Sequence, residues 1–224
     1  KIGVALVDIL AGLYGTIAIQ AALRQRDSTG TGQQIDMALL DVGVGVLANQ
    51  AANYLVSGAT PRRMGNTHPN IAPYQVFPAA DGAMIVAPGN DSQFAALCRA
   101  LGVSELANDI RFRTNSERLV HREALTAILR RQTLKYRRDA LVEKLNAAGV
   151  PAGPINTVAE VLSDPQVVHR KMVLEQDDPT LLGGVARTLR TPITFMGTVL
   201  ASGRPPPRHG QHTTEILKEL GLTS

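Results

Sequence analysis

The sequence predicts a mixed α/β protein, and three observations support this class. Apolar residues recur at helical spacing over 9–26 and over 39–56. The Asp81-Gly82 pair lies between two apolar runs within 74–88, which is a strong signal for a β-hairpin. Helical and strand patterns are interspersed along the 224 residues without a steady βα repeat. The residues alone therefore predict a mixed α and β fold and leave the sheet order open.

The first quarter of the chain predicts a helix, a turn, a strand and a second helix. Arg24 and Arg26 lie near the end of the first apolar pattern, where cations suit the helix dipole. The Ser-, Thr- and Gly-rich stretch that follows is typical of a turn. The predicted elements are a helix over 9–26, a turn over 27–32, a strand over 33–37, a helix over 39–56 and a Gly-, Pro- and Arg-rich connector over 58–73.

After the hairpin the patterns predict mainly helices and one further strand pair. Gly149 suits the residue after a helix, and Gly183-Gly184 suits a turn between two strands within 173–196. Three consecutive prolines extend the stretch 204–210. The remaining predicted elements are helices over 92–102, 117–130 and 136–148, an extended segment over 150–155, helices over 157–163, 164–172 and 213–220, and those two strands.

Composition is that of a globular protein with an aliphatic core. Hydrophobic residues make up 44% and charged residues 19% of the chain, while aromatic residues are only 4%. Cys98 is the sole cysteine, so no internal disulfide is possible, and we expect it to pack in the core. We find no uninterrupted apolar stretch near the roughly 20 residues that a membrane span needs. We therefore expect a cytoplasmic protein without a membrane partner.

The basic residues cluster in one stretch, which raises the question of nucleic-acid binding. The net charge is +4, and Glu117 and Glu123 interrupt the basic run. We interpret the run as solvated helix faces and expect no nucleic-acid partner. Its arginines are Arg111, Arg113, Arg118, Arg122, Arg130, Arg131, Arg137 and Arg138.

Two patterns that could bind a phosphate or a metal are incomplete. The glycines of 29–32 follow a predicted helix and lack the Gly-Lys-Ser/Thr of a P-loop. His209 and His212 have a spacing that zinc ligands use, but no second pair of Cys or His residues accompanies them. We expect no metal and no tightly bound cofactor.

Asp8 follows an apolar run and opens an apolar helix. A carboxylate at that place can accept hydrogen bonds from the free N–H groups of the helix start, and it meets the positive end of the helix dipole. A carboxylate in a site can also act as a covalent nucleophile. The residues around Asp8 leave both interpretations open.

An ordered set of motifs resembles the class III CoA-transferases, the family of formyl-CoA and carnitine CoA-transferases. The resemblance covers nearly the whole chain, although family members have roughly as many residues again before the position of Asp8. Its motifs are Val7–Gly12, Ala21–Arg26, Thr29–Gln33, Asp36, Asp41, Arg63–Asn66, Ala72–Tyr74, Ala80–Gly82, Gly89–Asp91, Gly149–Pro154 and the Pro-rich tract before Gln211–Thr213.

The resemblance implies an α/β fold with two domains and an interlocked dimer. It assigns 1–60 to part of a large Rossmann-like domain, 61–71 to a linker and 72–165 to a small α+β domain. The stretch 166–224 is then a return linker and a C-terminal segment that packs on the large domain. Because the missing half would supply most of the large domain, we expect exposed apolar surface on 9–26 and 39–56, and either a homodimer or association with a missing N-terminal half.

The resemblance also implies an activity and a set of site residues. It implies transfer of coenzyme A between an acyl-CoA and a small carboxylic acid, with coenzyme A as substrate. Asp8 occupies the position of the family's nucleophilic aspartate, which forms a mixed anhydride and then an enzyme–CoA thioester. Residues expected near the substrate or coenzyme A are Leu39, Gly65, Asn66, His68, Gly89, Asn90 and Asp91.

Two alternatives remain beside CoA transfer. The first alternative is a 2-methylacyl-CoA racemase that uses Asp8 and Asp91. In the racemase branch of the family, a glutamate at the place of Asp91 works with the equivalent of Asp8 and an upstream histidine. Asp91 is shorter than glutamate, and we favour a turn as the explanation of Gly89-Asn90-Asp91, because Gly, Asn and Asp are the usual turn residues. The second alternative is an inactive structural or regulatory subunit.

Overall fold

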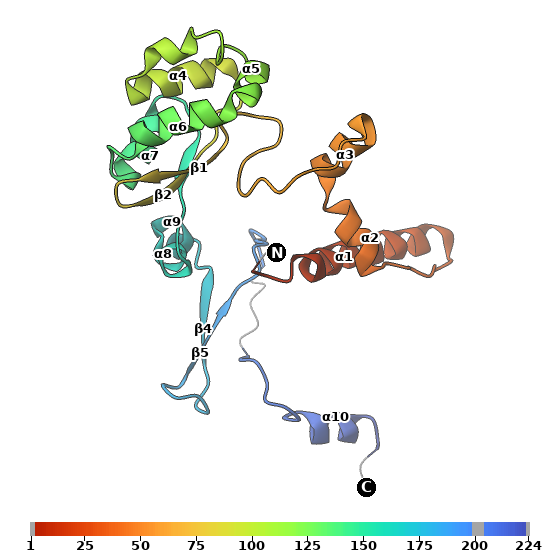
Figure 1. The fold of residues 1–224 in the computed structure, drawn as a ribbon. Helices are drawn as coiled ribbons and strands as arrows, with labels where there is room; N and C mark the ends of the chain where they lie inside the picture. The colour runs from red at the N-terminus through yellow and green to blue at the C-terminus, as the bar shows by residue number, and fades with distance from the viewer. Residues whose placement is uncertain (1–2, 199–203, 223–224) are drawn as a thin grey trace. The chain divides into compact units, whose positions relative to one another are not determined.

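The computed structural model describes residues 3–198 and 204–222 and shows helices with two small antiparallel sheets (Figure 1). The mixed α and β class is therefore confirmed. The backbone divides into two compact units, Lys1–Gly65 and Asn66–Ser224, and each is described by itself.

The first unit consists of three helices, α1 (Leu6–Thr29), α2 (Leu39–Gly45) and α3 (Ala48–Ser57). Helix α2 and the segment before it lie along α1, and the contact is tight at Gly15 and of ordinary van der Waals length at Gly43. A Cβ placed on Gly15 of α1 would lie 3.2 Å from the Met37 methyl carbon, and one on Gly43 of α2 would lie 3.9 Å from a methyl group of Val7.

Three predictions about this unit need correction. Helix α1 begins at Leu6, three residues before the predicted start. The predicted strand over 33–37 is wrong, because within the described residues no strand lies beside it to share a hydrogen-bond ladder. The single helix over 39–56 is also wrong: it breaks between Gly45 and Ala48, where Ala48 has a φ of 43°. Glycine is a weak helix former, which favours the break after Gly45.

The apolar side chains of the first unit are largely uncovered. Helix α1 has no buried residue, and Val42 is the one buried residue of α1–α3 within the described part of the chain. Ile17 in α1 is 65% exposed and Val56 in α3 is 89% exposed. The expected exposure of apolar surface on 9–26 and 39–56 is confirmed.

Helix α1 is also long and apolar enough to cross a membrane, judged by length and composition only. The expectation that no segment reaches that length is wrong, because the apolar residues of α1 are interrupted only by small and uncharged residues over most of the helix. In a helix, glycines and hydroxyl residues between the apolar positions still allow a long segment with few charges.

The second unit contains a three-stranded antiparallel sheet in the order β1 (Gln75–Ala79), β2 (Gly82–Val86) and β3 (Ala152–Pro154). Ala79 pairs with Gly82 across the turn, so the predicted hairpin at Asp81-Gly82 is confirmed. Phe77 lies opposite Met84 in the register, and both side chains are buried. One face of the hairpin therefore belongs to the core.

Helices pack on this sheet, and their bounds refine the predicted ones. The predicted helix over 117–130 is two helices, which meet at His121. The predicted helix over 136–148 begins at Arg138, where the carboxylate of Asp81 accepts a hydrogen bond from the Arg138 N–H at 2.7 Å. The helices are α4 (Asp91–Leu101), the short 3-10 helix η1 (Ser104–Ala107), α5 (Asn115–Val120), α6 (Arg122–Thr133) and α7 (Arg138–Ala147).

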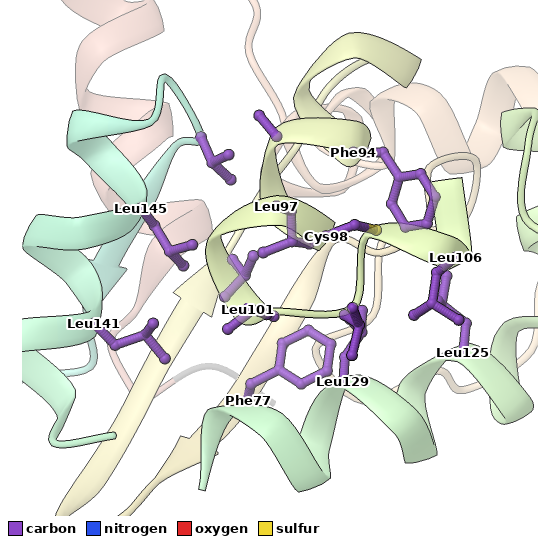
Figure 2. Packing of buried hydrophobic residues seen from close by; sticks show 14 of the residues in the cluster. Phe77, Phe94, Leu97, Cys98, Leu101, Leu106, Leu125, Leu129, Leu141 and Leu145 are labelled. Carbon is purple, nitrogen blue, oxygen red and sulfur yellow. The ribbon is translucent and has the colours of Figure 1, made fainter. Parts of the chain in front are cut away.

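Figure 2 shows buried residues from the core that the β1–β3 sheet and its helices enclose, and we call this part of the second unit, residues 75–154, the small domain. Strands β1 and β2, the short helix η1 and helices α4, α6 and α7 contribute to this core. Phe77 comes from β1, and Cys98 comes from α4 and is fully buried, which confirms that this cysteine packs. Burial of this apolar surface stabilises the small domain. Labelled core residues are Phe77, Phe94, Leu97, Cys98, Leu101, Leu106, Leu125, Leu129, Leu141 and Leu145.

The rest of the second unit contains a hairpin and three short helices. Gly183 and Gly184 have φ values of 92° and 70° in the turn of the hairpin, so the predicted strand pair is confirmed. The helix predicted over 164–172 is shorter and ends at His169. The elements are α8 (Val158–Ser163), α9 (Pro165–His169), β4 (Val173–Asp177), β5 (Val185–Leu189) and α10 (Thr213–Glu219).

Candidate functional site

Asp8 lies in the first turn of α1 and is exposed. The residue at the N-cap is Ala5, and the Asp8 carboxylate makes no hydrogen bond or ion pair within residues 3–198 and 204–222. The interpretation of Asp8 as a helix cap is therefore wrong. The backbone N–H groups of Val7 and Asp8 also have no backbone acceptor in the described chain, so donors and a free carboxylate share one helix end.

Leu39 begins α2, in the same unit as Asp8. Its side chain is 54% exposed. A groove of about 380 Å³ runs between α1 and the segment that leads into α2, and its walls include Tyr14, Ile17 and Met37. Leu39 therefore belongs to the uncovered apolar surface of the first unit.

Gly65 and Asn66 lie on either side of the boundary between the two units. Gly65 has a φ of 62°, which a glycine adopts without strain. The Asn66 side-chain oxygen accepts a hydrogen bond from the Val76 N–H at 2.8 Å, which ties Asn66 to strand β1.

His68 packs on Tyr74, with the ring centroids 5.0 Å apart and the planes 23° from parallel. Its Nδ1 accepts a hydrogen bond from the Asn70 N–H at 3.1 Å. The backbone N–H of His68 also donates to the Tyr74 carbonyl at 2.9 Å. His68 is thus fixed within a compact loop.

Gly89, Asn90 and Asp91 form the entry to helix α4. The Asn90 side-chain oxygen accepts a hydrogen bond from the Gln93 N–H at 2.9 Å and caps the helix, and the Gly89 N–H donates to the Gln93 side chain at 2.6 Å. The Asp91 carboxylate accepts a hydrogen bond from Arg118 at 2.6 Å. These residues form a helix entry, with Asp91 as the first residue of α4, so the predicted turn is wrong, and Asp91 has a specific partner.

Arg118 is the functional-site neighbour that sequence reasoning missed. Its side chain is 2% exposed, whereas that of Asp91 is 59% exposed. The Nε of Arg118 donates to the Ala72 carbonyl at 2.6 Å, and Nη1 donates to the Phe112 carbonyl at 2.9 Å. Its guanidinium also lies 4.4 Å from the centre of the Phe94 ring. Each of the three nitrogens of this buried cation therefore has a hydrogen-bond acceptor.

The interpretation of the arginine run as solvated helix faces is wrong for Arg118 and incomplete for Arg122. Arg122 is half-buried, its Nη2 donates to the Pro69 carbonyl at 3.3 Å, and burial lowers the pKa of its guanidinium. The Nη1 of Arg122 is buried without a hydrogen-bond partner in the described chain. No local pattern separates Arg118 from its neighbours, because its Asp91 and Ala72 partners lie 27 and 46 residues away.

The structure brings some of the predicted residues together. The segment 66–75, which carries Asn66 and His68, and the loop 89–91 are both held by α5 through Arg118. Asp8 and Leu39 lie in the other unit. Within residues 3–198 and 204–222 there is no group of three or more His, Cys, Asp and Glu side chains that could hold a metal ion.

Comparisons with known proteins give one consistent result. Residues 1–213 match the model of CoA-transferase family III. The succinate–glutarate CoA-transferase of Agrobacterium fabrum is 48% identical over 222 residues, which are 98% of this chain and 54% of that protein. The human succinyl-CoA:glutarate CoA-transferase is 38% identical over 218 residues, which are 97% of this chain and 49% of that protein.

A solved structure agrees with this result. The crystal structure of a CAIB/BAIF family protein from Brucella suis matches with a TM-score of 0.79 and 53% identity, and the match covers 98% of this chain and 56% of that one. The chain thus spans about half the length of the curated relatives that it matches.

Proposed function

The chain belongs to CoA-transferase family III, and from this membership we propose that it forms part of an acyl-CoA:carboxylate CoA-transferase in which Asp8 is the nucleophile. The observation that carries the proposal is the state of Asp8. Its carboxylate is exposed, is not engaged by any described residue, and lies at the first turn of a 24-residue helix within the matched region.

The proposed reaction has four covalent steps. The Asp8 carboxylate attacks the thioester carbonyl, which releases the CoA thiolate and leaves a mixed anhydride. The thiolate then attacks the Asp8 acyl carbon and expels the donor acid, which gives an aspartyl-CoA thioester. The acceptor carboxylate attacks that thioester and forms a second anhydride. The released thiolate finally attacks the acceptor's acyl carbon, which yields the new acyl-CoA and restores Asp8.

Each of these steps passes through a tetrahedral oxyanion that needs hydrogen-bond donors. In the first turn of α1, the amides of Val7 and Asp8 lack backbone acceptors in the described residues. Donors at a helix start also carry the positive end of the helix dipole. Their place beside Asp8 supports the nucleophile over a purely structural role.

The substrates that we propose are acyl-CoA thioesters and small dicarboxylic acids. The Agrobacterium and human relatives are named for succinate and glutarate, and the first is 48% identical over nearly the whole chain. Coenzyme A enters and leaves as a substrate in this proposal, with no tightly bound cofactor or metal. Leu39, Gly65, Asn66, His68 and the loop 89–91 are proposed to contact the substrate or to exclude water from the anhydride.

Racemisation is the weaker alternative because of the partner of Asp91. A racemase would need the Asp91 carboxylate to exchange a proton with the α-carbon of the substrate. One oxygen of that carboxylate is instead bound to a buried guanidinium at 2.6 Å. This ion pair favours a structural anchor at Asp91 and supports CoA transfer.

The active assembly that we propose includes more protein than this chain. The apolar residues of α1 are uncovered, and the matched relatives are about twice as long. A further Rossmann-like portion, within one polypeptide or from another chain, would cover α1 and α2, and two such subunits would interlock. In this arrangement α1 is a core helix of a cytoplasmic enzyme and does not cross a membrane.

Covalent trapping tests the proposal directly. The assembled protein is incubated with succinyl-CoA, then treated with hydroxylamine, and its peptides are analysed by mass spectrometry. The expected result is a hydroxamate at Asp8 and none at Asp41, which occupies the matching first-turn position of α2 and serves as an internal control. Absence of label at Asp8, or full transfer activity in Asp8→Asn, refutes the nucleophile. A protein that binds acyl-CoA but never labels would be the inactive subunit.

A further inference from the structure

Arg118 joins two segments that are far apart in the sequence and that carry most of the candidates in the second unit. From α5 it binds the Ala72 carbonyl in the segment 66–75 and the Asp91 carboxylate at the start of α4. The first segment carries Asn66 and His68, and the second follows Gly89 and Asn90 directly. One buried side chain thus spans both segments.

Further contacts from α5 and α6 hold the segment 66–75. The Asn115 side chain accepts a hydrogen bond from the Ala72 N–H at 3.1 Å and donates to the Asn70 carbonyl at 2.9 Å. Arg122 reaches the Pro69 carbonyl at 3.3 Å. Unlike Asn115 and Arg122, Arg118 also binds Asp91 at the start of α4.

The surroundings of Arg118 make the contact specific for arginine. The guanidinium donates from three nitrogens to three acceptors in fixed directions and stacks on the Phe94 ring. A lysine carries one ammonium group and cannot reach the three acceptors with the same geometry. A buried donor network of this kind fixes the relative position of the groups that it joins.

We infer that Arg118 is a positioning residue for the transfer reaction. It fixes the position of the segment 66–75 relative to the loop 89–91 next to the substrate. The inference rests on the proposed function. Arg118 itself touches no reacting atom; it acts through Asp91 and through the Ala72 backbone. Its loss should loosen both segments, admit water to the anhydride and shift the reaction from transfer toward hydrolysis.

The test compares Arg118→Met, Arg118→Lys and Asp91→Asn with Arg111→Met in the assembled protein. Arg111 is the matched control, because it forms an exposed ion pair with Asp109 at the same nitrogen–oxygen distance of 2.6 Å. Two properties are measured: amide hydrogen exchange at Ala72 and Gln93, and the ratio of acyl-CoA hydrolysis to CoA transfer.

In Arg118→Met, exchange at both amides should accelerate at least about tenfold and transfer should fall about 10- to 100-fold with a higher share of hydrolysis. Arg118→Lys should recover part of each loss. Asp91→Asn should loosen Gln93 more than Ala72, because it breaks only one arm of the network. Arg111→Met should stay within about twofold of the wild type.

Three outcomes decide whether Arg118 is a positioning residue. Unchanged exchange in Arg118→Met, or in Arg118→Lys if the methionine variant does not fold, overturns the positioning role. Loosened amides with a normal transfer rate and normal hydrolysis ratio also overturn it, because the segments would then be ordered for stability alone. If the wild type transfers no CoA, the proposed function fails, and the exchange measurement still establishes whether Arg118 holds the two segments.

Discussion

The two units differ in whether they enclose a core. In the small domain of the second unit, β1 and β2 and the helices α4, α6 and α7 bury a continuous cluster that includes Phe77, Leu97 and Leu141. In the first unit, three helices that are as apolar in sequence bury only Val42 among the described residues. An apolar pattern produces a core only where other elements cover it. The apolar side chains of the unit that carries Asp8 are therefore left largely uncovered within the described residues.

Asp8 of the first unit differs from three aspartates of the small domain in whether its carboxylate has a structural partner. In the small domain, Asp81 caps α7, Asp91 binds Arg118 and Asp109 binds Arg111. Asp8 is exposed and has no such partner within the described chain. These three aspartates of the small domain thus hold structure, whereas the Asp8 carboxylate has no structural partner within the described residues.

Truncation of an apolar side chain should give the largest difference in stability loss between the two units. Leu97 is fully buried, so Leu97→Ala should lower the free energy of unfolding of the small domain by about 3 kcal/mol. Ile17 is 65% exposed, so Ile17→Ala should cost less than about 0.5 kcal/mol in the isolated chain. Hydrogen exchange of the β1–β2 ladder and of α1 measures each effect. A costly Ile17→Ala in the isolated chain would contradict the picture of an uncovered α1.

Thiol chemistry gives a second contrast. Burial raises the pKa of Cys98 to about 12 from its ordinary value of 9.0, so the thiol should resist iodoacetamide until the small domain unfolds. The pKa of Cys98 is higher in the folded protein than in the unfolded protein, so its contribution to the free energy of unfolding is fully present below pH 9. That contribution is lost as the pH rises from 9 toward about 12.

The matched comparison for this thiol is Leu13→Cys in a Cys98→Ser background, since Leu13 in α1 is 55% exposed. Its thiol should react promptly in the isolated chain, and reaction as slow as that of native Cys98 would show that α1 is covered. Alkylation followed by mass spectrometry gives both rates.

Helix capping should show a smaller difference. Asn90 caps α4 through the Gln93 N–H, so Asn90→Ala should destabilise the small domain by about 1 kcal/mol. Ala5 makes no cap hydrogen bond for α1, and Ala5→Gly should change stability by only a few tenths of that amount. Thermal unfolding followed by circular dichroism measures both. Equal losses of stability in Asn90→Ala and Ala5→Gly would show that the two helix starts do not differ in their dependence on a cap.

The smallest expected effect concerns Asp109. Hydrogen bonds from Arg111 hold the pKa of this exposed carboxyl at about 2, below its ordinary 3.8. Because the folded pKa is depressed, the associated stability is present above pH 3.8 and disappears as the pH falls through about 2. Arg111→Met should return the pKa toward 3.8, as NMR titration of the side-chain carbons can show. An unchanged pKa would mean that the ion pair is absent in solution.

Much of the fold follows from local sequence signals. Asp81-Gly82 and Gly183-Gly184 identified both hairpins, because turn geometry depends on a few adjacent residues. Helix bounds were less accurate where a distant residue ends or starts the helix, as Asp81 does for α7. The strand over 33–37 failed because a strand requires a partner, which no local pattern supplies.

The candidate site residues also divide into those that short local motifs indicate and those that only long-range contacts reveal. Asp8 and the motifs around it could be read from the order of residues, and the family membership supports that reading. Arg118 could not be found, because it looks like any other arginine in a basic run and its partners are remote in the sequence.

The sequence by itself determined the mixed α and β class, the hairpins and a mainly aliphatic core, because each depends on composition, periodicity or short local motifs. It also indicated Asp8 as a candidate site residue. Only the tertiary structure decided that Asp8 does not cap its helix and that Arg118 is a buried bridge between two segments. Burial and long-range hydrogen bonds depend on which elements meet in space, and an arginine or an apolar face carries no local mark of the partner that it will meet.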